Sequence, residues 1–244
     1  MTDLPRGQRA PVPDRGLLVS SAVALVGFAV ILLTVVLTSG SDALDLAGVS
    51  GVDSLRGASV SAVATVVTGL GSFAVLLTVT VAAIVGLLVQ TRQVWAPAIL
   101  AGSVVGTASL VTLVKIAVGR ARPSSAAVIG SPARDFSFPS GHTTNATLVY
   151  ILAALLLTAH WRHPLRRRMV TASAVALALL IGLTRVYLGY HWATDVLAGW
   201  LLSTGVIAAS CFTVRRLGPA DDHDASVDTV LPLPHHRIRP HHLV

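Results

Sequence analysis

The chain has 244 residues, of which 53% are hydrophobic and only 12% are charged. In soluble domains about a quarter of the residues are charged, so this composition excludes an ordinary soluble fold and predicts an integral membrane protein. The formal net charge is +7, but the basic residues are scattered between apolar runs, which argues against a nucleic-acid partner.

Six apolar runs are long enough to cross a bilayer as helices, because a hydrocarbon core of about 30 Å requires about 20 helical residues. They are residues 17–38, 70–89, 94–115, 143–160, 169–188 and 193–214. The first run is longer than the apolar part of a signal peptide, so we expect it to be retained. The predicted fold is all-α, a six-helix membrane bundle over residues 17–214, with a short interfacial helix from about Val52 between the first two spans.

The two ends of the chain, residues 1–16 and 215–244, are rich in Pro, Asp and His and have no hydrophobic period. Such segments cannot bury enough apolar surface to fold, so we expect disordered cytoplasmic tails. His235–His236 and His241–His242 are pairs that could hold a metal ion adventitiously, but a solvated tail without a site is the simpler expectation.

The positions of Arg and Lys predict the orientation in the membrane, since cytoplasmic loops carry the excess. With both termini cytoplasmic, 12 of the 18 basic residues fall inside and 6 outside. The outer six are Arg56, Lys115, Arg120, Arg122, Arg134 and Arg185. Five of these six lie in only two loops, on the side that disfavours them, which indicates that they bind an anion. We expect a protein of the cell inner membrane with its site on the extracellular or periplasmic face.

The polar residues of the apolar region fall at four span ends that the order of spans must place on one side of the membrane. The third span ends with KIAVGRARP, the fourth begins after PSGH, and TRVYLGYHWATD joins the fifth to the sixth. Lys115 and Arg122 are seven residues apart and share a face if the helix persists. Taken alone, each is explained equally well as a snorkelling or solvated charge.

The stretch PSGH has the composition of a helix start. Ser140 is a good N-cap, and Gly141 allows an anion to approach the backbone N–H groups at the positive end of the helix dipole. Capping alone accounts for Ser140, but it does not account for His142 at the same membrane edge.

His191 and Asp195 are four residues apart, so they share one face of a helix that begins the sixth span. A carboxylate there keeps one imidazole nitrogen protonated and leaves the other nucleophilic. The alternative is an interfacial His191 and an Asp195 that only favours the helix dipole. Asp135 is the other carboxylate of the region between Asp53 and Asp221, but it lacks a partner at helical spacing, so we favour Asp195.

Three motifs therefore follow one another: Lys-x6-Arg-Pro from Lys115 to Pro123, Pro-Ser-Gly-His from Pro139 to His142, and Arg-x5-His-x3-Asp from Arg185 to Asp195. In this order, at these span ends, they resemble the signature of the type 2 phosphatidic acid phosphatase superfamily. The resemblance covers residues 70 to 214. Thr184 stands where the family commonly has Ser and keeps the hydroxyl group.

The resemblance implies hydrolysis of a lipid phosphate or diphosphate without metal or other cofactor. By this resemblance His191 attacks phosphorus, Asp195 orients it, and His142 protonates the leaving oxygen and then activates water. The residues implied to bind phosphate are Lys115, Arg122, Ser140, Gly141 and Arg185. The expected partners are membrane lipids and an amphiphilic substrate; isoprenoid-lipid diphosphate, phosphatidylglycerophosphate and phosphatidic acid all remain open, as does the oligomeric state.

Two other functions share some of these features. A lipid or anion transporter also uses intramembrane cations, but it needs polar residues at mid-span, and here they lie at span ends. Soluble vanadate-dependent haloperoxidases carry the same signature, but six apolar runs argue against that class. A membrane protein without any site would require three independent motifs to coincide.

Overall fold

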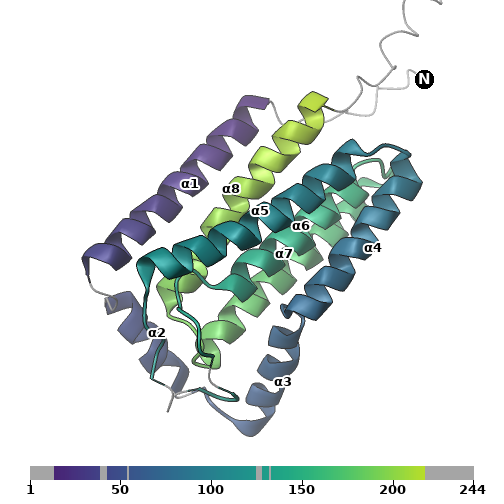
Figure 1. Cartoon of the computed structure of the whole chain (residues 1–244). Coiled ribbons are helices and arrows are strands. Elements are labelled where there is room, and N and C mark those ends of the chain that lie inside the picture. The colour runs from purple at the N-terminus through teal and green to yellow at the C-terminus, as the bar shows by residue number, and fades with distance from the viewer. Residues whose placement is uncertain (1–13, 39–42, 54, 125–127, 132, 218–244) are drawn as a thin grey trace, which may run out of the picture.

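The computed structural model describes residues 14–38, 43–53, 55–124, 128–131 and 133–217. Most of the two predicted tails therefore lies outside the described residues. The described residues form helices and loops but no strand, in agreement with the all-α prediction. The helices are α1 (Asp14–Leu37), α2 (Ala43–Asp53), α3 (Ala58–Gly69), α4 (Phe73–Thr91), α5 (Trp95–Val118), α6 (Gly141–Leu157), α7 (Pro164–Tyr187) and α8 (Ala193–Leu217). Figure 1 shows the longer helices, α1 and α4 to α8, running alongside one another, with α2 and α3 at one end.

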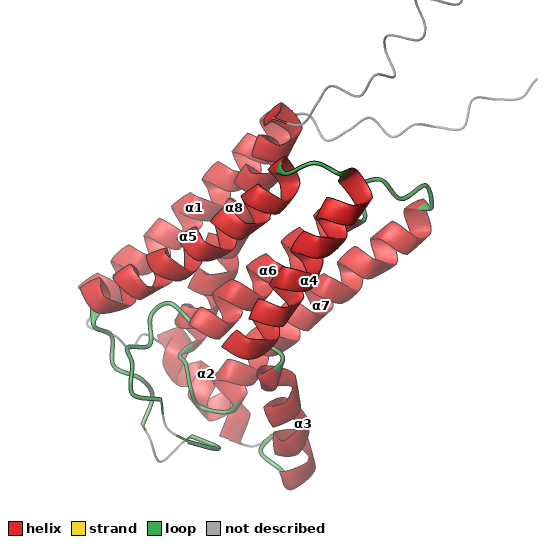
Figure 2. Cartoon of the chain, turned by 45° about the vertical axis from the view of Figure 1, so that its right-hand side comes forward, coloured by secondary structure: helices red, strands yellow, loops and turns green. Residues whose placement is uncertain are grey.

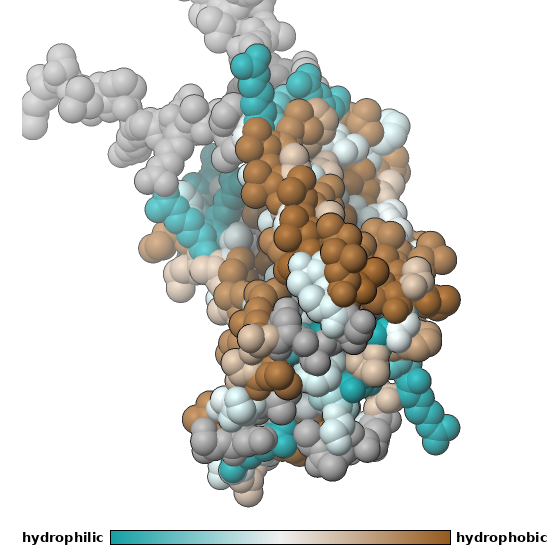
Figure 3. All heavy atoms as spheres, turned by 90° about the vertical axis from the view of Figure 1, so that its left-hand side faces the viewer, coloured by the Kyte–Doolittle hydropathy of each residue, from teal (hydrophilic) through white to brown (hydrophobic). Residues whose placement is uncertain are grey.

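Five of the described helices, α1, α4, α5, α7 and α8, are long and apolar enough to cross a membrane. Their outward faces carry large apolar side chains, among them Val23 at 66% exposure and Phe73 at 82%. On the face shown in Figure 3, hydrophobic residues form a broad band between more hydrophilic ends. A soluble monomer rarely exposes so much apolar surface, so the molecule is an integral membrane protein.

Helix α6 differs from the other long helices in length and surroundings. It has 17 residues, ten of which are buried, and it packs against α4, α5, α7 and α8. Because its neighbours enclose it, α6 needs no long lipid-facing surface. The predicted fourth span, 143–160, starts two residues after the observed start of α6 and runs three residues past its end.

Close contacts set the height of α8 against α6. A Cβ added to Gly199 would come within 2.9 Å of the Thr144 hydroxyl oxygen, so only glycine allows this approach. One turn further along, the Ser203 hydroxyl donates to the Thr144 carbonyl at 2.7 Å. These contacts fix the start of α8, and therefore Asp195, beside the start of α6.

The segment between α1 and α4 holds two short helices where the sequence predicted one. Residues 70–72 are not helical and separate α3 from α4. Helix α4 begins at Phe73, three residues after the predicted start of the second span. Helix α6 stabilises this non-helical segment, because the hydroxyl of its Tyr150 donates to the Leu70 carbonyl at 2.9 Å. Figure 2 shows α2 and α3 at the end of the bundle opposite the N-terminal end of α1.

Candidate active site

The polar span ends meet at one end of the bundle, where α5 and α7 finish and α6 and α8 begin (Figure 1). The left-handed residue Gly119, at φ +63°, ends α5 with its N–H bonded to the Lys115 carbonyl. Arg122 therefore does not continue the helical face of Lys115, contrary to the expectation from their spacing. The two side chains instead converge because the loop after Gly119 brings Arg122 back toward Lys115.

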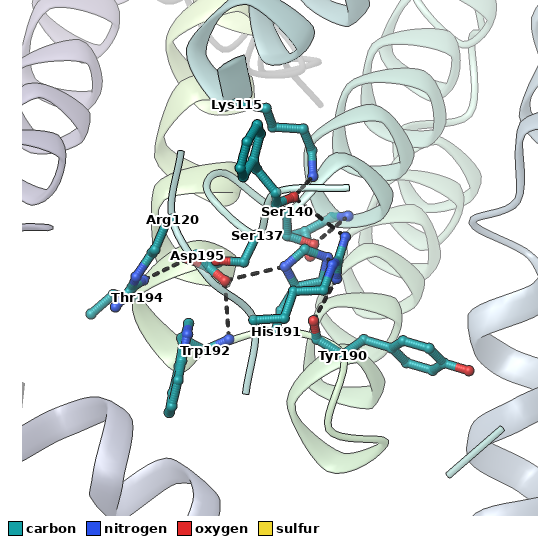
Figure 4. A network of polar contacts seen from close by, with 12 residues as sticks. Lys115, Arg120, Ser137, Ser140, Tyr190, His191, Trp192, Thr194 and Asp195 are labelled. Carbon is teal, nitrogen blue, oxygen red and sulfur yellow. Dashed lines mark hydrogen bonds and ion pairs between the residues drawn. The ribbon is translucent and has the colours of Figure 1, made fainter. Parts of the chain in front are cut away.

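His191 lies in the turn between α7 and α8 and is 2% exposed. Its Nδ1 lies 3.2 Å from Asp195 Oδ2 (Figure 4). On the other side of the ring, Nη1 of Arg122 lies 3.1 Å from Nε2. Because arginine can only donate, Nε2 must accept, which places the ring proton on Nδ1. Burial lowers the pKa of His191 to about 4, although the hydrogen bond and charge of Asp195 oppose this shift. The ring is therefore neutral near pH 7.

Asp195 is fully buried and uses both carboxylate oxygens. Oδ2 accepts from His191 and, at 3.0 Å, from the Trp192 backbone N–H, while Oδ1 accepts from Arg120 at 2.6 Å (Figure 4). A buried carboxylate needs such partners, since an unpaired one is strongly unfavourable. Asp195 thereby fixes both the orientation and the tautomer of His191.

Behind Asp195 lies a set of buried charges that the sequence did not reveal. Arg120, 5% exposed, also forms an ion pair with Asp45 of α2, whose side chain is fully buried. Asp45 in turn accepts from the Thr194 backbone N–H at 3.0 Å and from its hydroxyl at 2.9 Å. We call Asp45, Arg120 and Asp195 the buried cluster. Its three side chains together carry one net negative charge beside His191, which favours positive charge on the imidazole ring.

The two cations of the first motif meet on Asp135. Its Oδ2 accepts from Lys115 at 2.8 Å and its Oδ1 from Arg122 at 2.6 Å, while its side chain is 59% exposed. Partial burial alone raises the pKa of Asp135, but the hydrogen bonds and charges of Lys115 and Arg122 outweigh it and lower the pKa to about 2. We call Lys115, Arg122 and Asp135 the open cluster. Neither partner could be inferred from helical spacing, because Lys115 and Arg122 lie 20 and 13 residues from Asp135 along the chain.

Arg185 approaches the same space from the end of α7. Its guanidinium carbon lies 4.0 Å from the centre of the Tyr190 ring, and Nη1 donates to the Thr68 hydroxyl at 3.0 Å. Its buried Nε has no hydrogen-bond partner among the described residues. A third cation is therefore present with hydrogen-bonding capacity to spare.

The residues at the start of α6 have different roles in the site. Ser140 is fully buried, and its N–H donates to the Asp195 carbonyl at 3.1 Å, while its hydroxyl oxygen accepts from Thr143. It caps α6 and ties it to α8, and it does not line the cavity. Gly141 and His142 do line it, and in the described part of the chain their backbone N–H groups have no acceptor. Those N–H groups, with the helix dipole, suit a bound anion.

A cavity of about 580 Å³ connects these groups. Its polar end is formed by Lys115, Arg122, Asp135, His142, Arg185 and His191. Away from this end, α4 and α5 line it with mostly apolar side chains, such as Leu76 and Ile84 on one wall and Val104 and Val111 on the other. The arrangement suits an amphiphile with an anionic head and an apolar tail.

Known proteins are similar to this chain in sequence, over the region that contains the three motifs, and in fold. The family model described as the PAP2 superfamily matches residues 96–218, which contain all three motifs. Phosphatidylglycerophosphatase B of Bacillus subtilis is 42% identical over 89 residues, covering 35% of this chain and 41% of that protein. Lipid A 1-phosphatase of Rhizobium etli is 32% identical over 139 residues, covering 51% of this chain and 56% of that protein. The chain thus spans about half or less of these two curated relatives.

A solved structure extends the likeness to nearly the whole bundle. The crystal structure of a transmembrane PAP2 type phosphatidylglycerolphosphate phosphatase from Bacillus subtilis matches with a TM-score of 0.72 and 26% identity. The match covers 82% of this chain and 98% of that one. The likeness therefore includes helices that precede the stretch matched by the family model.

Proposed function

The chain belongs to the PAP2 superfamily, and from this premise we propose that it is a metal-independent phosphatase that hydrolyses a lipid phosphate or diphosphate through a phosphohistidine intermediate. One observation carries the proposal. The acceptor nitrogen Nε2 of His191, oriented by Asp195, adjoins a cavity that holds three cationic side chains.

In the first step, Nε2 of His191 forms a bond to phosphorus while the bond from phosphorus to the lipid oxygen breaks. The Nδ1 proton stays on the ring in its hydrogen bond to Asp195, so the phosphorylated imidazole is cationic and the buried cluster stabilises it. His142, which lines the same cavity, donates a proton to the departing oxygen. The negative charge of the arriving phosphate favours the protonated form of His142.

In the second step, His142 accepts a proton from a water molecule that attacks phosphorus. The bond from phosphorus to Nε2 breaks, and its electron pair returns to His191. Inorganic phosphate leaves, and both imidazoles regain their starting states. The same residue serves as acid and then as base, as microscopic reversibility requires.

Positive side chains take the place that divalent metals have in other phosphatases. Phosphoryl transfer spreads charge over the non-bridging oxygens, so catalysis depends mainly on positioning and charge neutralisation. Lys115, Arg122 and Arg185 supply three positive charges, with the α6 N-terminus beside them. Such a set of donors repels a divalent cation, and we therefore expect turnover to survive a chelator.

The cavity supports a lipid substrate. Its apolar walls on α4 and α5 suit an acyl or isoprenoid chain, while the head reaches the cations. The named relatives comprise a phosphatidylglycerophosphatase, a lipid A 1-phosphatase and an undecaprenyl-diphosphatase. Phosphatidylglycerophosphate, isoprenoid-lipid diphosphate and phosphatidic acid all fit the cavity chemistry.

We assign α6 as a sixth span that is shielded from lipid by its neighbours, and α2 and α3 as interfacial helices on the side of the site. The cluster of arginines at 162–168 lies at the opposite end of the bundle from the site. Since short cytoplasmic loops carry excess Arg, the site faces outward from the inner membrane and both termini are cytoplasmic.

The decisive assay is phosphate release by the purified full-length protein in nanodiscs, with the three lipid classes as substrates and EDTA present. We expect release from at least one lipid by the wild type and none by His191→Ala. Asp14→Asn, which removes an exposed ion pair at the other end of the bundle, is the matched control and should retain activity. Release by His191→Ala, or a strict need for added Mg²⁺, contradicts the mechanism; lipid uptake without release favours a transporter.

Sidedness needs a separate measurement. In a Cys211→Ser background, Ser131→Cys and Arg162→Cys place one thiol on exposed loops at opposite ends of the bundle. A membrane-impermeant maleimide applied to intact bacterial cells should label the first variant and not the second. The reverse pattern contradicts the outward orientation.

A further inference from the structure

Arg122 has every donor occupied. Its Nε bonds to the Asp135 carbonyl and Nη2 to the Asp135 carboxylate and the Phe136 carbonyl, while Nη1 bonds to the Tyr190 carbonyl and to His191 Nε2. A guanidinium has five N–H groups, and five acceptors are present. Arg122 therefore cannot bind a phosphate oxygen until it gives up some of these bonds.

The bond from Arg122 to Nε2 blocks the chemistry as well. The lone pair that has to attack phosphorus is the one that accepts from Nη1. Asp135 holds the other amino group of the same guanidinium at 2.6 Å. The contact that keeps the cation from an incoming anion also helps to keep it on the nucleophile.

We propose that Asp135 is an internal ligand that occupies the phosphate-binding cations in the resting enzyme, and that the substrate phosphate must displace it before His191 can react. The inference rests on the proposed function. On displacement, Lys115 and Arg122 transfer from the carboxylate to phosphate oxygens, and Nε2 of His191 becomes free. Asp135 thus sets the affinity for substrate and couples binding to release of the nucleophile.

The position of Asp135 suits exchange. It lies in the loop between α5 and α6, its side chain is 59% exposed, and it lines the cavity beside His191. A carboxylate offers one negative charge to the two cations, whereas a phosphate dianion offers two charges and three acceptor oxygens. Because the pKa of Asp135 is about 2, it stays ionised at working pH, and a competing anion has to drive the exchange.

Arg185 gives the incoming anion a first contact. It is 6% exposed, lines the same cavity, and is not bound to Asp135. Its guanidinium stacks on Tyr190 and bonds to Thr68, and it forms no ion pair with a carboxylate in the described part of the chain. Phosphate can thus bind to Arg185 while Asp135 still holds Lys115 and Arg122, and then replace the carboxylate.

The test is the affinity for inorganic phosphate, measured by isothermal titration calorimetry on the full-length protein in nanodiscs. Asp135→Asn keeps the shape and removes the charge, so we expect the Kd to fall about tenfold. Asp135→Glu restores the carboxylate and should return the Kd toward the wild-type value. Asp14→Asn makes the same charge change in an exposed ion pair at the other end and should leave the Kd unchanged.

Turnover separates this role from simple positioning of the cations. If Asp135 competes with phosphate, Asp135→Asn lowers KM and keeps kcat within a few-fold of wild type. An unchanged or weaker phosphate affinity together with a large loss of kcat overturns the proposal. Thermal unfolding and Asp135→Ala show whether such a loss comes from misfolding, since a folded Asp135→Ala protein must also bind phosphate more tightly.

The proposed function can fail independently. If the wild type neither binds phosphate nor releases it from lipid, the assignment of the site is wrong. If the wild type does both and Asp135→Asn binds phosphate no more tightly, only the role of Asp135 is wrong.

Discussion

Arg120 and Arg122 are two residues apart, yet they belong to ion-pair clusters of opposite character. Arg120 is 5% exposed and lies between two fully buried carboxylates, Asp45 and Asp195. Arg122 binds Asp135, which is 59% exposed, and it lines the cavity. Both clusters reach His191, the first through Nδ1 and the second through Nε2. In the proposed mechanism, the Nδ1 side of the ring, which keeps its proton, thus adjoins buried charges, and the Nε2 side, which reacts, adjoins a pair with an exposed carboxylate.

The cost of desolvation explains this division. Removing one member of a buried ion pair leaves an uncompensated charge and costs about 3–5 kcal/mol. In the open cluster the Lys115 and Arg122 side chains are only 12% and 13% exposed, but Asp135 is 59% exposed, so its carboxylate can be hydrated when the cations change partner. We therefore expect the buried cluster to stay fixed during the proposed turnover, while the open cluster exchanges its carboxylate for substrate.

The largest expected effect comes from Asp195→Asn. The amide can turn an N–H toward Nδ1 of His191, which moves the ring proton to Nε2 and removes the reactive lone pair. In a Ser-His-Asp triad the equivalent change lowers kcat by about 10⁴-fold through the wrong tautomer, and we expect a similar loss here. Single-turnover phosphate release by the folded variant measures it; a loss below tenfold contradicts the orienting role.

Arg120→Met tests whether the buried cluster is structural. It leaves two buried carboxylates without their shared cation, so we expect the free energy of unfolding to fall by about 3–5 kcal/mol. Chemical unfolding in detergent measures the change. Arg216→Met is the matched control, since Arg216 pairs with Asp14 with 60% and 37% of the two side chains exposed, and should cost at most about 1 kcal/mol. Equal losses for the two variants would remove the distinction between the clusters.

Arg122→Ala tests the other side of the ring. Losing one donor to the developing charge typically costs about 2.7–4 kcal/mol of barrier, or 10²–10³-fold in kcat, and we expect a loss in this range. Stability should change much less than in Arg120→Met, because the partner Asp135 can be hydrated. Full activity on the preferred lipid phosphate contradicts a role for Arg122 in turnover.

The sequence predicted the elements that depend on local pattern. Six apolar runs correspond to the six longer helices. The spacing of His191 and Asp195 led to the right pair, but the predicted shared helix face is wrong, because His191 lies in the turn before α8 and reaches Asp195 from there. The cap at Ser140 also followed from its position before an apolar run. These features are determined within one or two helical turns, so one sequence is sufficient to find them.

What escaped prediction depends on contacts between distant segments. Asp45 reaches Arg120 and Thr194 across 75 and 149 residues, and no motif includes it. Asp135 was set aside for lack of a neighbour at helical spacing, although its partners lie 20 and 13 residues away. One signal was available in the sequence: Arg120 lies two residues before Arg122, and a second arginine at this span end indicated a second group of carboxylates to pair with it.

The smallest expected effect concerns pH and measures how completely the buried cluster encloses His191. A pKa of about 4 keeps the ring neutral at pH 5, so kcat/KM should retain about nine-tenths of its limiting value there, against about 3% for an unperturbed pKa near 6.5. The substrate phosphate titrates near pH 6, and the proposed acid His142 has its own titration, so both ionisations have to be determined by NMR and divided out. The same shift makes the folded chain bind fewer protons than the unfolded chain between these two pKa values, so His191 lowers stability as pH falls through this window. A corrected acid limb near 6.5 would show that water reaches the ring, and that the contrast between a sealed Nδ1 side and an open Nε2 side does not hold.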